Sequence, residues 1–250
     1  MTNLARIPRL YVEAPLAPGA GVSLGREQAH YVCNVMRLTA GQPLRLFNGR
    51  DGEWLCTLEA TGKRECSLTC TEQTAGHRRP PDLDYLFSPL KHARLDYMAQ
   101  KATEMGVRRL RPVFTERTVA TRVKLERLRA NAVEAAEQCN LVTVPEVLPP
   151  EPLKAIVTQW DPQRRLVFCD EAAAIADPIE ALKGLPRGPL ALLAGPEGGF
   201  SEAERETLLA LEFVTAISLG PRVMRADTAG VAALTLVQAV WGDWSNHQRD

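Results

Sequence analysis

The hydrophobic pattern changes character about a third of the way along the chain. Up to about residue 72, short apolar runs alternate with glycines, and only Arg26–Met36 has a helical period. Such runs predict short strands, and short strands with regular turns between them are typical of a small β-barrel. The expected strands are Leu10–Val12, Pro43–Phe47, Trp54–Leu58 and Ser67–Thr71.

A linker over 76–81, stiffened by two prolines, precedes a different pattern in which strands and helices alternate. Helices are expected over Ala93–Glu104, which Gly106 can end, and over Lys124–Cys139. This alternation predicts an α/β domain with a mostly parallel sheet. We therefore expect a barrel over residues 1–74 and an α/β domain over residues 75–250. The expected strands are Asp84–Ser88, Leu110–Phe114 and Leu166–Cys169.

The stretch Gly188–Ala233 carries the clearest pattern, because strand, glycine loop and helix occur twice in succession. The apolar run Pro189–Ala194 ends at Gly195, and the run Val214–Leu219 ends at Gly220. Both glycine loops would thus follow the carboxyl ends of strands, where open α/β sheets bind ligands.

The helices that follow these loops have recognisable starts. Ser201 and Glu204 have the spacing of a capping box, and Asp227 or Thr228 is expected to cap the last helix. That last helix, Thr228–Trp241, is apolar around much of its circumference, which favours burial on most sides.

The first glycine loop does not fit a phosphate. Gly195-Pro-Glu-Gly-Gly has the wrong spacing for a dinucleotide fingerprint, and no GKS or GKT follows it. Glu197 would place a negative charge where a pyrophosphate should lie. The loop better suits an adenosine whose polar edges are read by backbone groups, and the alternative is an ordinary tight turn.

The two loops also carry a family resemblance. GPEGGFSEAE followed by LGPRVMRADTA closely resembles the paired signature of the ribosomal RNA small subunit methyltransferase E family, within the SPOUT superfamily. Earlier segments resemble further parts of that family in the same order. They are RIPRLYVE, HYVCNVMRLTAGQPLRLFNG, KATEMGV, TERTVA and AVEAAEQCN.

The resemblance implies a SPOUT-type, trefoil-knotted parallel-sheet domain preceded by a PUA-like β-barrel that binds RNA. It also implies a homodimeric enzyme that uses S-adenosylmethionine to methylate N3 of a uridine in the 16S rRNA of the small ribosomal subunit. The residues that we expect to bind the cofactor are Leu193, Gly195, Pro196, Gly198, Gly199, Leu219, Gly220, Met224, Arg225, Thr228 and Ala229.

Arg225 is also the expected catalytic residue, because an anionic uracil would need a positively charged donor at its oxygens. The alternative is a structural arginine that pairs with Glu197 or Asp227. The chain departs from the family pattern at Ala226 and Asp227, where the family usually has Thr and Glu, and at Leu141, where an arginine is common.

Composition narrows the remaining choices. The 250 residues are 45% hydrophobic and 24% charged, as in soluble globular proteins, and the amino terminus lacks the hydrophobic segment of a signal peptide. We therefore expect a cytoplasmic protein without membrane spans. Six cysteines without a CxxC pair and four scattered histidines argue against a zinc site or another metal.

The charge is unevenly distributed although it sums to zero. Residues 1–129 hold 21 basic and 13 acidic side chains, and the remainder hold 9 and 17. This asymmetry favours a polyanion-binding face in the first half, and the alternative is a solvated helix face. The expected RNA contacts are Arg6, Arg9, Arg37, Arg78, Arg79 and Lys91.

Two alternatives to this function stay open, and so does the role of one segment. The enzyme could act on another RNA position, such as a ribose 2′-oxygen, or the chain could be an assembly factor that binds RNA without catalysis. The segment Thr115–Thr118 follows a strand, so it could line the RNA side of the site or form a simple surface turn.

Overall fold

The computed structural model describes residues 4–61, 66–91, 93–173 and 177–244. It divides into two compact units, the first made of Met1–Arg79 with Ala136–Val144 and the second of Pro80–Ala135 with Pro145–Asp250. The domain boundary between residues 74 and 75 stays a prediction. The return of 136–144 to the first unit was not expected from the sequence.

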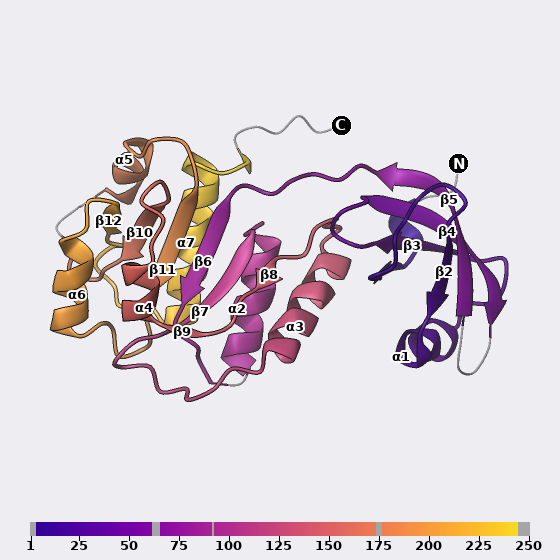
Figure 1. The fold of residues 1–250 in the computed structure, drawn as a ribbon, viewed down its shortest axis with the longest axis horizontal. Helices are drawn as coiled ribbons and strands as arrows, with labels where there is room; N and C mark the ends of the chain where they lie inside the picture. The colour runs from indigo at the N-terminus through magenta and orange to yellow at the C-terminus, as the bar shows by residue number, and fades with distance from the viewer. Residues whose placement is uncertain (1–3, 62–65, 92, 174–176, 245–250) are drawn as a thin grey trace. The chain divides into compact units, whose positions relative to one another are not determined.

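The first unit is built on a curved five-stranded sheet with the order β1-β3-β4-β5-β2 (Figure 1). β1 pairs with β3 in parallel, and the other pairs are antiparallel. Its strands are β1 (Arg9–Tyr11), β2 (Gly21–Leu24), β3 (Pro43–Phe47), β4 (Glu53–Thr61) and β5 (Cys66–Ala75). Four of them were expected, whereas β2 was missed because its buried Val22 and Leu24 alternate with Gly21 and Ser23 and form no apolar run.

The predicted helix over Arg26–Met36 forms in two parts. The α-helix α1 (Arg26–His30) continues as a π-helical turn, η2 (Tyr31–Val35). A short 3₁₀ turn, η1 (Leu4–Arg6), precedes the sheet. Ala29 and Val32 bury their side chains in the same cluster as the inward-facing residues of the strands, such as Leu24, Leu44 and Leu58.

A buried ionic cluster lies in this unit. The Nε atom of Arg9 donates to the Glu53 carboxylate at 2.5 Å, and Arg45 Nη1 donates to it at 3.1 Å. Burial alone would raise the pKa of Glu53, but hydrogen bonds from Thr74 and Arg9 and the charges of both arginines lower it overall.

Arg9 also holds the end of a helix. Its Nη1 donates to the carbonyl of Ala136 at 2.7 Å, and its Nη2 donates to that of Leu141 at 2.7 Å. These carbonyls lie in and just after the last turn of the helix over Leu125–Gln138, and that of Ala136 also accepts from the Leu141 N–H at 3.1 Å. Arg9 was expected to contact RNA, but its side chain is buried and its donors are used within the protein. That expectation was wrong for Arg9.

The second unit contains a parallel sheet with the order β12-β10-β11-β6-β7-β8, and β9 lies beside β7. Every pairing in it is parallel. The strands are β6 (Leu83–Phe87), β7 (Arg109–Phe114), β8 (Glu146–Val147), β9 (Glu151–Pro152), β10 (Arg165–Cys169), β11 (Leu190–Ala194) and β12 (Val214–Ile217). The predicted α/β class with a parallel sheet is confirmed, and the trefoil knot stays a prediction.

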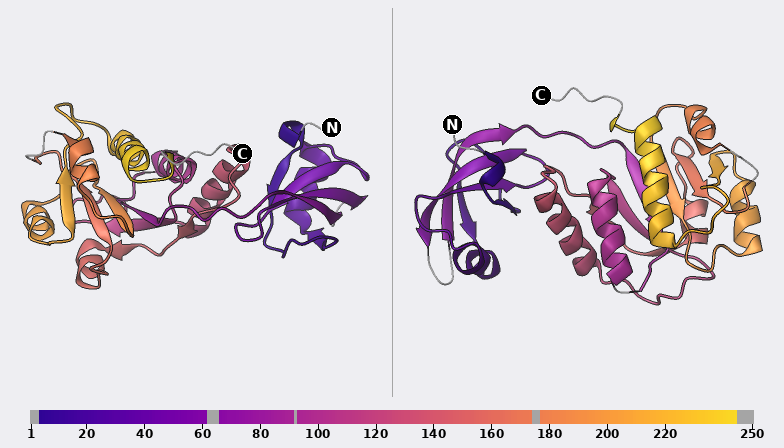
Figure 2. Two further views of the ribbon diagram at one scale, coloured as in Figure 1. Left: turned by 90° about the horizontal axis from the view of Figure 1, so that it is seen from above. Right: turned by 180° about the vertical axis from the view of Figure 1, so that it is seen from behind.

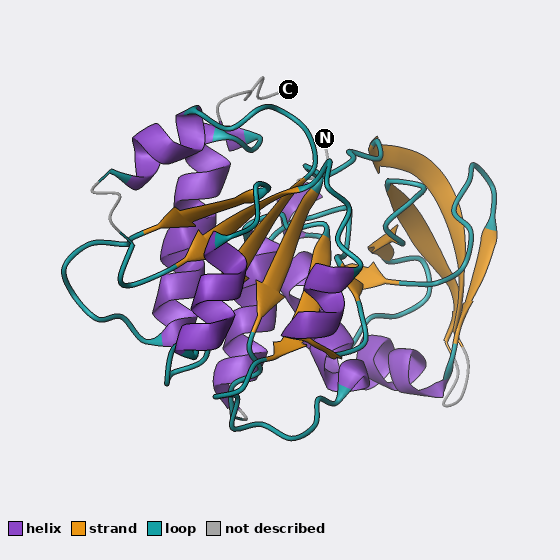
Figure 3. Cartoon of the chain, turned by 60° about the vertical axis from the view of Figure 1, so that its left-hand side comes forward, coloured by secondary structure: helices purple, strands orange, loops and turns teal. Residues whose placement is uncertain are grey.

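Helices cover both faces of this sheet (Figures 2 and 3). On one face, Leu153 of α4 and Leu208 of α6 pack against Leu86 and Phe168 of the strands. On the other face, Gly230 of α7 lies so close to the Tyr85 hydroxyl that a Cβ would collide with it. The helices are α2 (Ala93–Glu104), α3 (Leu125–Gln138), α4 (Leu153–Thr158), α5 (Pro178–Lys183), α6 (Glu202–Leu209) and α7 (Ala226–Val240).

Helix boundaries follow the sequence signals in part. The capping box of Ser201 and Glu204 is confirmed, and Gly106 adopts a φ of +71° after α2. The expected caps of α7 were wrong, because the helix begins two residues earlier and Arg225 occupies the N-cap position. Helices α4 and α5 were not expected, since six residues are too few for a clear period. None of the helices in the described ranges combines the length and apolar character that a membrane crossing requires.

Replacement of Glu53 by Gln should destabilise the first unit by about 3–5 kcal/mol at pH 7, because two buried guanidinium groups would lose their counter-charge. The folded-state pKa of Glu53 is lowered, so its stabilisation is present above the unfolded pKa of about 4.3 and is lost as the pH falls through the folded pKa. The variant should therefore approach the wild type below about pH 4. Hydrogen exchange in β3 and β4 measures this difference.

Glu59→Gln is the matched control, because Glu59 lies on the same strand with its side chain exposed. Equal losses of stability in both variants would contradict a specific role for the buried cluster.

Candidate functional site

A cavity of about 310 Å³ lies at the carboxyl ends of three neighbouring strands. Because β10 lies between β11 and β12 in the sheet, the loops after β11 and β12 flank the loop after β10. The lining residues include both predicted glycine loops. The full set of lining residues is Arg117, Cys169, Asp170, Glu171, Ala172, Ala194, Gly195, Pro196, Glu197, Gly199, Phe200, Glu202, Arg205, Ile217, Leu219, Gly220, Arg222, Val223, Met224, Ala226 and Ala229.

The loop after β11 and the first turn of the following helix are held from outside at three points. Arg94 of α2 forms an ion pair with Glu197, and Arg117 Nη1 donates to the Gly198 carbonyl at 2.9 Å. The backbone N–H of Glu116 donates to Glu204 Oε1 at 2.9 Å. The loop therefore has its shape before any ligand arrives, which lowers the entropy lost on binding.

Two positions in this loop require glycine for structural reasons. Gly199 has a φ of +68°, which few other residues adopt readily. A Cβ on Gly195 would lie 2.5 Å from the ring of Phe200. That ring packs edge-on against Phe168 at 4.8 Å, so it has little room to retreat.

The loop after β12 is more open. Gly220 has a φ of +101°, and Val223 is 89% exposed. Arg225 is exposed at the start of α7, and the described contacts contain no ion pair between it and Glu197 or Asp227. Its side chain does not line the cavity itself. Arg225 is thus a positive charge beside the cavity rather than a member of its wall.

The loop after β10 was missed at the sequence level. Asp170 is buried and accepts hydrogen bonds from Arg205 Nε at 2.9 Å and from the Ala172 N–H at 3.1 Å. Burial raises the pKa of the Cys169 thiol to about 12, so the thiol is neutral at pH 7 and is no nucleophile. The rule that ligands bind at strand ends could have found these residues, because they follow the predicted strand Leu166–Cys169.

Most of the expected cofactor residues lie together. Leu193 is the clear exception, because its side chain is buried in the core between the sheet and α4. Gly198 contacts Arg117, and Thr228 is exposed outside the cavity wall. The expected residues that line the cavity are Gly195, Pro196, Gly199, Leu219, Gly220, Met224 and Ala229.

The expected RNA contacts other than Arg9 have exposed side chains. Arg6, Arg37, Arg78 and Arg79 belong to the first unit, and Lys91 belongs to the second. Their contact with RNA stays a prediction. Among the described residues, no group of three or more His, Cys, Asp and Glu side chains lies close enough to hold a metal ion.

Comparisons with known proteins identify the family. Residues 77–238 match the RNA methyltransferase domain, and residues 24–69 match the RNA methyltransferase PUA domain. The ribosomal RNA small subunit methyltransferase E of Rickettsia conorii is 30% identical over 92% of this chain and 94% of its own length. The chain belongs to this methyltransferase family.

Two solved structures of similar proteins support the same assignment. The family member from Neisseria gonorrhoeae, bound to S-adenosylmethionine, is 28% identical with a TM-score of 0.84 and covers 96% of this chain and 100% of its own. A methyltransferase from Legionella pneumophila with the same bound cofactor is 29% identical with a TM-score of 0.83 and covers 95% and 99%. The predicted family, methyltransferase class and PUA-type domain are thereby confirmed.

Gly195→Ala should destabilise the second unit by about 1–3 kcal/mol, because the added methyl group would overpack the ring of Phe200. Gly184→Ala is the control, since its Cβ would lie 3.5 Å from the nearest atom at a φ of −72°. Chemical denaturation of both variants measures the difference. Equal stability of the two variants would show that the Phe200 ring moves aside without a cost in folding free energy.

Proposed function

We propose that this protein is a cytoplasmic enzyme that transfers a methyl group from S-adenosylmethionine to N3 of a specific uridine in 16S rRNA. The observation that carries the proposal is the preformed cavity at the ends of β10, β11 and β12, lined by both glycine loops. Relatives of the same family and fold bind S-adenosylmethionine, which supports the choice of cofactor.

The residues of the cavity fit this cofactor. Apolar side chains such as Ile217, Leu219 and Met224 line one part, which suits an adenine ring. Four carboxylates and three arginines line the cavity, and this mixed set suits a ligand that carries positive charges and a carboxylate. When bound, S-adenosylmethionine supplies an electrophilic methyl group on a positively charged sulfur.

The protein must then make a uracil nitrogen nucleophilic. N3 carries a weakly acidic proton, and the charge left by its removal spreads over the two neighbouring carbonyl oxygens. We propose that the Arg225 guanidinium stabilises this charge, because the side chain is exposed beside the cavity without a described ion-pair partner. A positive donor in this position lowers the barrier through electrostatic stabilisation of the charge that develops on the uracil oxygens.

Calorimetric titration with S-adenosylmethionine, followed by mass spectrometry of 16S rRNA from a deletion strain, tests the proposal. The proposal requires cofactor binding and the loss of one N3-methyluridine from the deletion strain. Loss of a ribose methyl group instead would assign the enzyme another position on RNA. Absence of cofactor binding would leave an RNA-binding assembly factor.

Arg225→Ala should lower the single-turnover rate by about two to three orders of magnitude, the usual loss when one stabilising donor is removed. Its affinities for RNA and cofactor should stay within a few-fold of the wild type. Arg78→Ala with Arg79→Ala is the contrasting variant, which should weaken RNA binding and flatten its salt dependence. Near-normal turnover in Arg225→Ala would remove its proposed role.

We also propose that the protein is a homodimer through α7, acting on RNA of the small ribosomal subunit. One side of this helix is buried within the subunit by residues such as Ala233, Leu234 and Val237. Val231 and Leu236, on other sides of it, are only partly buried, which suits further burial by an identical helix. Sedimentation at micromolar concentration should show a dimer, and a monomer would contradict this interface.

A further inference from the structure

The face of the parallel sheet beneath α4 changes from apolar to charged along its strands. Towards the carboxyl ends, Leu86, Val113 and Phe168 belong to the core on this face. Side chains on one face recur at every second position, so Asp84, Arg109 and Arg111 lie on the same face nearer the amino ends. Arg164, just before β10, joins them there.

One buried carboxylate, that of Asp84, forms ion pairs with three arginines in this region. Asp84 is fully buried, and its oxygens lie 2.6 Å from Arg109 Nε, 3.5 Å from Arg111 Nη1 and 3.6 Å from Arg164 Nη1. Arg164 Nη2 also pairs with Asp82 at 2.9 Å. Arg111 is therefore the arginine with the weakest internal partner.

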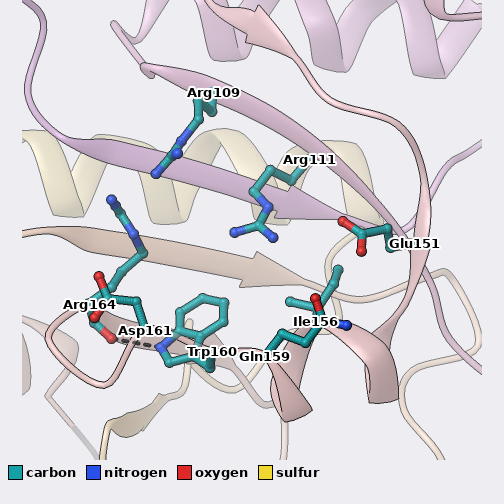
Figure 4. Close-up of a pocket in the computed structure, with 8 residues that line it drawn as sticks. All are labelled: Arg109, Arg111, Glu151, Ile156, Gln159, Trp160, Asp161 and Arg164. Carbon is teal, nitrogen blue, oxygen red and sulfur yellow. Dashed lines mark hydrogen bonds between the residues drawn. The ribbon is translucent and has the colours of Figure 1, made fainter.

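The same arginines line a cavity of about 200 Å³ (Figure 4). The guanidinium of Arg111 points into the space between the strands and Trp160, and its Nε is buried without a hydrogen-bond partner. The Nη groups at the end of the same guanidinium are the donors that a ligand in the cavity could reach.

The wall opposite Arg111 is rigid. The Trp160 ring stacks on Phe213 at 5.5 Å, and its indole N–H donates to the Arg164 carbonyl at 2.8 Å. The Arg111 guanidinium carbon lies 5.9 Å from the centre of the ring. At this distance the two groups are in cation–π contact with nothing between them, so a ligand would reach Arg111 from beside the ring.

Apart from Ile156 and Trp160, the rest of the lining is polar and carries no positive charge. Gln159, Glu151 and Asp161 also face the cavity. In the described residues neither carboxylate forms an ion pair with Arg109, Arg111 or Arg164. Asp161 Oδ1 accepts from the Gln163 N–H at 3.0 Å, which leaves its Oδ2 and the Glu151 carboxylate as acceptors for a hydroxyl donor. Arginine forks beside free acceptors match a phosphate joined to a sugar hydroxyl.

We propose that this cavity, at the sheet edge opposite the methyltransferase site, binds a phosphate group together with a neighbouring ribose hydroxyl. Its volume holds a ribose phosphate without the base. The same chemistry is offered by a free sugar phosphate and by the backbone of an RNA strand. The site does not depend on the proposed methyl transfer.

Titration with ribose 5-phosphate, monitored through the Trp160 indole resonance, tests the site. Wild-type protein should show saturable shifts, and Arg111→Gln should bind at least about tenfold more weakly because one charged donor is lost. Arg165→Gln is the control, since Arg165 lies at the same sheet edge on the other face and donates to the Glu212 carbonyl. Arg111→Lys keeps the charge and should lose less affinity than Arg111→Gln.

Two further outcomes identify the source of the phosphate. If it belongs to RNA, Arg111→Gln should also weaken binding of a short mixed-sequence RNA and reduce its salt slope by about one. If it belongs to a free sugar phosphate, binding of that RNA should be unchanged. The absence of saturable shifts in the wild type, or equal shifts in Arg111→Gln and Arg165→Gln, would overturn the proposal.

Discussion

Parallel pairing of β10 between β11 and β12 is the constraint on which the methyltransferase site depends. β11 and β12 follow one another along the chain but are not neighbours in the sheet, since they lie on opposite sides of β10. Their carboxyl ends therefore bring together the three loops that follow Cys169, Ala194 and Ile217, which are far apart along the chain. A different strand order would leave each glycine loop as a separate surface turn.

The two edges of this sheet have opposite chemical character. At the carboxyl edge, glycine loops and small residues create space, and charged groups line it. At the amino edge, rigid strand positions carry arginines that are fixed by the buried carboxylate of Asp84. The apolar layer of Leu86, Phe168 and Leu193 lies between the two edges, and the two cavities share no lining residue.

The sequence alone predicted the structure correctly wherever the pattern involved residues close together along the chain. Helix α2 has the predicted bounds, the capping box of α6 is present, and both glycine loops line one cavity. It was insufficient where the partner is distant. Arg9 looked like a surface cation, but its burial depends on carbonyls more than 120 residues away. Arg117 looked like part of a turn, yet it contacts Gly198 across 81 residues. The position of Arg225 at the cap of α7 also followed from the tertiary fold rather than from a capping pattern.

Glu204 has a consequence for the order of folding. Its Oε2 accepts from the Ser201 N–H within one helical turn, whereas its Oε1 accepts from Glu116, which is 88 residues away. The first contact needs almost no loop closure, so it can form as soon as α6 nucleates. The second must wait until β7 has paired in the sheet. The Glu204 carboxylate thus makes one of its contacts early in folding and the other late. The loops around the cavity at the ends of β10, β11 and β12 reach their final shape only when the late contact has formed.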